Sequence, residues 1–132
     1  MPHYPVLQPN GLMAVFSTIP DAFTHYDLSD EEAAAAVANW HTGNIAGYVA
    51  DTRAGNLLPH QMDWTEALTW HLYRHDLDDD ALAMIAITPP DQRQSVAYCV
   101  HMLADQAAED TEPERAASIT ARADSIMQAL GI

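Results

Sequence analysis

The chain has 132 residues, and 48% of them are hydrophobic, which is enough for a folded core and excludes a disordered polyelectrolyte. Its 19 acidic residues outnumber five basic ones, all of them arginine, so the formal charge is −14 at pH 7. A surface this acidic repels phosphate backbones, and we therefore expect no direct binding to nucleic acid. The single cysteine, Cys99, excludes an intrachain disulfide and a cysteine-based zinc knuckle.

The first residues of the chain contain neither the basic segment nor the apolar segment that is typical of a signal peptide. No apolar run approaches the ~18 residues that a membrane span requires. We therefore expect a cytoplasmic protein that does not associate with membranes. The acidic excess has two interpretations. It attracts a basic partner protein, or it reflects the residue usage of a particular genome or of a salty cytoplasm.

Apolar residues on both sides of a Pro-Asn-Gly sequence at 9–11 predict a β-hairpin over residues 4–18. Proline fixes φ at the second turn position and glycine accepts the left-handed one, so a three-residue loop places Tyr4 opposite Phe16. Both faces of this hairpin are apolar, and helices should cover at least one of them. Residues 19–28 are predicted to be a connector.

Capping residues and apolar periodicity predict about five helices in the rest of the chain. Ser29 and Glu32 have the spacing of a capping box, and the sequence Thr-Glu-Pro-Glu at 111–114 has it again. Asp63 is predicted as another cap, and Gly131 as the stop of the last helix. The predicted helices cover residues 30–41, 64–75, 79–87, 90–109 and 112–130.

Residues 45–60 are the least clear part of the sequence. Residues 45–50 fit a third short strand or an irregular helix, and strand or coil is the favoured prediction. The predicted fold is α+β and mainly helical, with the N-terminal β-hairpin packed on about five α-helices. We expect residues 1–132 to form a single compact domain.

His71 and His75 are the candidate metal ligands of this sequence. They lie four residues apart on one face of the predicted helix 64–75, so both imidazoles can reach one divalent metal ion. The glutamate that zinc proteases carry directly after the first histidine is missing. Buried histidines of a core or interface, or an acid–base pair, are the alternatives. A third ligand would come from His41, His60, His101 or one of the acids in 76–80.

Other chemistry has little support in the sequence. Residues 76–80 lack the glycine and the terminal glutamate of a calcium loop, and they fit a solvated helix cap better than a cation site. No serine lies in a nucleophile elbow, and without lysine a Walker-type phosphate loop is excluded. We therefore predict no catalytic residues and no cofactor apart from the metal ion of the alternative hypothesis.

The acidic side chains are the candidate partner-binding residues. Carboxylates spaced along helices can imitate a phosphate ladder, so the leading hypothesis is a non-enzymatic interaction module. Such a module would occupy a partner's basic nucleic-acid-binding surface. Small acidic inhibitors of phage and mobile-element origin act in this way, and this chain is similar to them in charge and size only. The candidate residues are Asp76, Asp78, Asp79, Asp80, Asp105, Glu109, Asp110, Glu112 and Glu114.

Two further expectations complete the sequence-based hypotheses. The alternative function is a metal-binding protein or metal-dependent hydrolase centred on His71 and His75. A homodimer is also a hypothesis, because both faces of the hairpin are apolar and Trp70 lies off the main apolar stripe of its predicted helix.

Overall fold

The structure is a computed structural model that describes residues 3–132. Contacts within the chain divide it into two compact units, Met1–Ala67 and Leu68–Ile132, and the division falls inside one helix. The first unit holds a three-stranded antiparallel sheet of order β1-β2-β3, and the second is helical. The fold is α+β and mainly helical, as predicted. That all residues form a single domain stays a prediction.

The predicted hairpin is confirmed in its register. Strands β1 (His3–Leu7) and β2 (Met13–Ser17) are antiparallel, and Tyr4 lies opposite Phe16. The loop closes through the Gln8 amide, which donates to the Leu12 carbonyl at 2.9 Å. Gly11 has φ +86°, the left-handed conformation that the turn requires of its last residue.

A third strand, β3 (Ala22–Leu28), corrects the prediction of a connector over residues 19–28. It pairs antiparallel with β2 through an irregular register. Its far end is held by the buried Gln8 side chain, whose oxygen accepts from the Asp27 amide at 2.6 Å and whose nitrogen donates to the Asp27 carboxylate at 2.8 Å. Asp27 has φ +57°. These bonds lie beside the register shift between Met13 and Val15, beyond which Met13 still pairs with Leu28.

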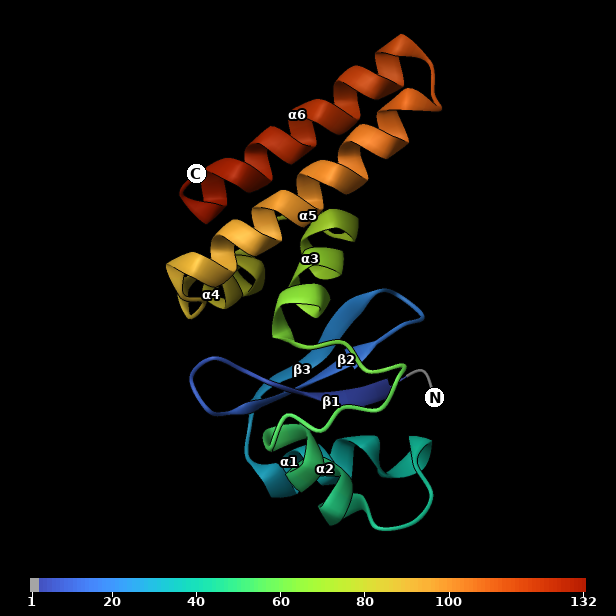
Figure 1. Ribbon diagram of the computed structural model, residues 1–132, viewed down its shortest axis with the longest axis vertical. Helices are drawn as coiled ribbons and strands as arrows, with labels where there is room; N and C mark the ends of the chain where they lie inside the picture. The colour runs from blue at the N-terminus through green and yellow to red at the C-terminus, as the bar shows by residue number, and fades with distance from the viewer. Residues whose placement is uncertain (1–2) are drawn as a thin grey trace. The chain divides into compact units, whose positions relative to one another are not determined.

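Two helices cover one face of the sheet (Figure 1). The predicted capping box of α1 (Asp30–Val37) is confirmed, because the Ser29 hydroxyl accepts from the Glu32 amide at 3.2 Å and the Glu32 carboxylate accepts from the Ser29 amide at 3.0 Å. The α-helix ends before the predicted residue 41, because the chain tightens into the 3₁₀ turn η1 (Ala38–Trp40).

The helix α2 (Ile45–Arg53) corrects the prediction of strand or coil at 45–60. Its start is fixed by the Asn44 side chain, which accepts from the Gly47 amide at 3.0 Å. Val49 is buried and packs in one cluster with Met13 of β2 and Ala33 of α1. Alanine and glycine give this helix little amphipathic pattern, so its cap and its tertiary contacts decide its conformation.

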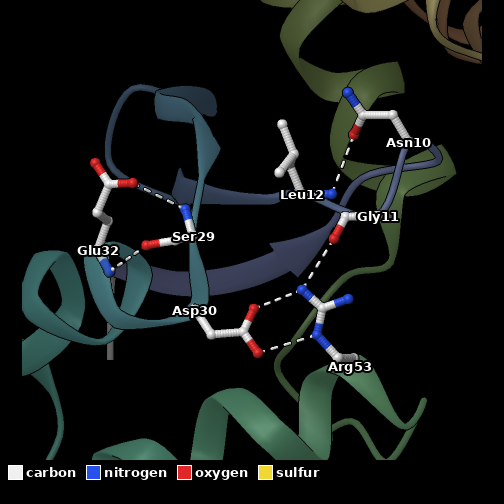
Figure 2. Close-up of polar contacts among 7 residues, drawn as sticks. All are labelled: Asn10, Gly11, Leu12, Ser29, Asp30, Glu32 and Arg53. Atoms are coloured by element: carbon white, nitrogen blue, oxygen red, sulfur yellow. Dashed lines mark hydrogen bonds and ion pairs between the residues drawn. The ribbon is translucent and has the colours of Figure 1, made fainter.

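Arg53 joins three segments of the first unit that are distant in sequence (Figure 2). Its guanidinium donates to both carboxylate oxygens of Asp30, at 3.0 and 2.5 Å, and to the Gly11 carbonyl at 2.9 Å. The Arg53 guanidinium therefore links the hairpin turn, the start of α1 and the end of α2.

Gln61 links two other segments of this unit. Its side chain donates to the Pro5 carbonyl of β1 at 3.3 Å and to the Thr52 hydroxyl at 3.0 Å.

Four helices follow, at bounds close to those predicted: α3 (Trp64–Arg74), α4 (Asp79–Ala86), α5 (Pro90–Glu109) and α6 (Pro113–Leu130). The cap at Asp63 is confirmed by its 3.0 Å bond from the Glu66 amide, and Gly131 ends α6 with φ +80°. The second capping box is wrong. The N-cap of α6 is Glu112, whose side chain forms no capping hydrogen bond. Glu114 is therefore only two residues after the cap, whereas a capping box requires the acid three residues after it.

The long helices α5 and α6 lie side by side and antiparallel (Figure 1). The buried residues of the two helices are small and branched side chains at helical spacing, namely Val96, Ala97, Val100 and Ala104 of α5 and Ala123, Ile126 and Leu130 of α6. Between residues 3 and 132, no helix is both long enough and apolar enough to cross a membrane.

Candidate functional site

The turn between α5 and α6 gathers four of the predicted partner-binding residues. We call Glu109, Asp110, Glu112 and Glu114 the acidic turn. All four are exposed, and their side chains form no hydrogen bond or ion pair with any residue of 3–132. Asp105 lies one helical turn earlier and pairs with the His101 imidazole at 3.1 Å. The acidic turn is therefore a cluster of four carboxylates whose negative charges are not paired with any cation in the described part of the chain.

The second acidic group, residues 76–80, has more than one role. The Asp78 carboxylate accepts from the Ala81 amide at 2.8 Å and caps α4, as predicted. Asp79 and Asp80 follow in the first turn of α4, where negative charge favours the helix. Asp76 is exposed, and its carboxylate lies 3.9 Å from the Arg122 guanidinium of α6.

His71 and His75 lie together at the end of α3. The ring of His71 is buried and that of His75 is half-buried, and their centroids are 5.4 Å apart. Burial lowers the pKa of His71 below 6.5, and repulsion from His75 lowers it further, whereas the carboxylates of Asp78 and Asp80 oppose this shift. The neutral form of His71 is therefore favoured in the fold.

Stability should consequently fall as the pH drops below 6.5, because the unfolded chain then binds a proton that folded His71 resists. The loss reaches at most about 1.4 kcal/mol per pH unit, the limit for one proton. Urea unfolding at several pH values between about 7.5 and 5.5 measures this slope. His71→Asn should reduce this slope without abolishing it, because burial also lowers the pKa of His3 and that of His60. Ile19→Ala, at an exposed position without a titratable group, should leave the slope unchanged. An unchanged slope in His71→Asn would contradict the assignment.

A metal centre on these histidines stays a hypothesis. Across residues 3–132, no three His, Cys, Asp or Glu side chains gather closely enough to hold a metal ion. Of the proposed third ligands, His101 pairs with Asp105. Elemental analysis of the untagged protein, compared with His71→Ala, tests this hypothesis directly.

The helical unit contains a hollow that the sequence did not predict. It has a volume of about 440 Å³ and is lined by residues of α3, α5 and α6: Tyr73, Arg74, Ala107, Arg115, Ile119, Arg122, Ala123 and Ile126. Three of the five arginines of the chain therefore meet at one place. One signal was available, since Arg115, Ile119 and Arg122 are spaced to share one face of a helix. The contribution of α3 had no such signal.

Comparison with known proteins gives no relative. No protein-family model matches the sequence, and no curated protein or solved structure matches it either. No function can therefore be transferred to this chain from a known protein.

Proposed function

We propose that this chain is a non-enzymatic, cytoplasmic interaction module that binds a basic protein through the acidic turn. The observation that carries the proposal is the lack of any intramolecular partner, within residues 3–132, for the four exposed carboxylates of this turn. Arg115 is the residue directly after Glu114, and even this cation forms no ion pair with it. The charge of the turn is thus available to a partner.

The electrostatics of the whole chain support the same proposal. A formal charge of −14 on 132 residues attracts a basic surface at long range and raises the rate of encounter. The six-residue stretch from Glu109 to Glu114 then presents carboxylates on a turn fixed by two packed helices. A groove rich in arginine or lysine, of the kind that binds nucleic acid, is the complementary surface. The chain would act as an inhibitor by occupying that groove.

The experiment begins with proteins of the native host that bind the immobilised chain and are then purified. Their affinity for the wild type should fall steeply with salt concentration. Reversing the acidic turn should weaken binding at least about tenfold, equal to about 1.4 kcal/mol. The variant is Glu109→Lys, Asp110→Lys, Glu112→Lys and Glu114→Lys in one chain.

A matched control carries the same change of charge at other exposed positions. Glu31→Lys, Asp51→Lys, Asp91→Lys and Asp124→Lys together also move the formal charge from −14 to −6, since each reversal adds two. The control should bind within about threefold of the wild type if position decides binding. Equal weakening by both variants would show a diffuse charge effect and refute the assignment to the acidic turn. Competition with nucleic acid for the same partner then tests inhibition.

A further inference from the structure

We infer that the arginine-lined hollow of the helical unit binds a small organic anion, one with a single carboxylate or phosphate group on an apolar, planar body. This inference is independent of the acidic turn's role. At about 440 Å³, the hollow has the size of ordinary small-molecule sites. It brings together residues from three helices, and all of them belong to the unit Leu68–Ile132.

The concentration of positive charge is the first reason. The chain has five arginines against 19 acids, yet three of those arginines line this one hollow. Like charges that converge in this way repel one another, and an anion between them removes the repulsion. The planar guanidinium is also the group best suited to bind carboxylate or phosphate in two parallel hydrogen bonds.

Two of the three arginines are held in place. The Arg74 guanidinium lies over the rings of Trp70 and Tyr73, 5.6 Å from each centroid. Arg122 donates to the carbonyls of Leu72 and His75 at the end of α3, and the contact with His75 is the shorter one. Their positions therefore do not have to be ordered when a ligand binds, which lowers the entropic cost of binding.

Arg115 is the third, and it differs from the other two. Its side chain makes no hydrogen bond or ion pair with the residues from 3 to 132. It lies in the first turn of α6, where the helix dipole adds to its positive potential. All five donors of its guanidinium are thus left for a ligand, and Arg115 is the residue that we expect to contribute most to affinity.

The rest of the lining determines the body of the ligand. Ile119, Ala123, Ile126 and Ala107 provide an apolar wall, and Tyr73 adds an aromatic ring. Such a surface is suited to a flat hydrocarbon or aromatic group. Carboxylates lie beside the arginines, because Asp76 is 3.9 Å from Arg122 and Glu114 precedes Arg115. They repel polyanions, so a single anionic group is favoured over a polyphosphate or a nucleic acid.

The test uses 1-naphthoate as the probe and follows backbone amide shifts of the full chain by NMR. Saturable binding with a Kd on the order of 1 mM is expected, with the shifted amides clustered around 73–74, 107 and 115–126. Naphthalenemethanol, which has the same ring system without the charge, should bind about tenfold more weakly. 1-Naphthyl phosphate in place of naphthoate distinguishes a phosphate site from a carboxylate site by which of the two binds more tightly.

Variants make the assignment specific. Arg115→Gln should weaken naphthoate binding about tenfold. Arg115→Lys should weaken it less, because lysine keeps the positive charge but lacks the paired donors of the planar guanidinium. Arg53→Gln changes the net charge equally in the other unit and should leave the affinity unchanged. Circular dichroism checks that each variant is folded. Equal binding of the neutral analogue, scattered shifts or undiminished affinity in Arg115→Gln would overturn the proposal.

Discussion

Replacing Phe16 with alanine should lower the free energy of unfolding by about 3–5 kcal/mol. Phe16 is fully buried in the central strand β2 and contacts the rings of Tyr4 and Phe23, at 5.8 and 5.4 Å between centroids. Truncation removes these contacts and leaves a cavity that neighbouring strands cannot fill. Since domains are commonly stable by about 5–15 kcal/mol, this loss is a large fraction of the total. Urea unfolding followed by tyrosine and tryptophan fluorescence measures it.

The control for Phe16→Ala is Ile19→Ala in the same unit. Ile19 is 74% exposed, so its substitution should change stability by no more than about 0.5 kcal/mol. A loss below about 1 kcal/mol in Phe16→Ala would show that the ring does not occupy the packed centre of the sheet.

Ile126→Ala is the corresponding substitution in the helical unit, and it should cost about 2–5 kcal/mol. Ile126 is 1% exposed and lies in the buried apolar stripe of α6. Ile132→Ala, at a position that is 60% exposed, is the matched control and should be nearly neutral. If both isoleucine variants unfold at the same urea concentration, the burial of Ile126 does not stabilise this unit.

These two core variants also test whether residues 1–132 form a single cooperative domain. In one cooperative domain, Phe16→Ala would reduce the protection of slowly exchanging amides in both units by the same amount, and so would Ile126→Ala. In two independent units, each substitution would affect only the amides of its own unit. Native-state hydrogen exchange on the two variants distinguishes the two outcomes.

The sequence predicted those elements whose cause is local. The hairpin register follows from the turn at 9–11, and three helix starts follow from the side chains of Ser29, Asp63 and Asp78. Each of these features is decided within a few residues, and a pattern of residue types is enough to find it.

What the sequence did not predict depends on contacts between distant residues. Most side chains of β3 are exposed, so it lacks the alternation of a strand, and it is held by Gln8, 19 residues away from Asp27. The pattern of residues 45–60 did not predict the helix α2, whose start is fixed by the Asn44 side chain. The arginine-lined hollow combines α3 with a part of α6 about 40 residues later, and no local pattern predicts that meeting.

The β1 edge of the sheet has a consequence for recognition. Gln8 and Leu12 form a hydrogen-bonded pair, so the two-residue period points the nitrogen of Pro5 toward the open side of β1. Proline offers no donor there, and Gln61 already occupies the Pro5 carbonyl. An approaching strand would find neither group to pair with. A second copy or a partner that approaches this edge therefore has to recognise side chains, since β1 gives no continuous template for extending the sheet.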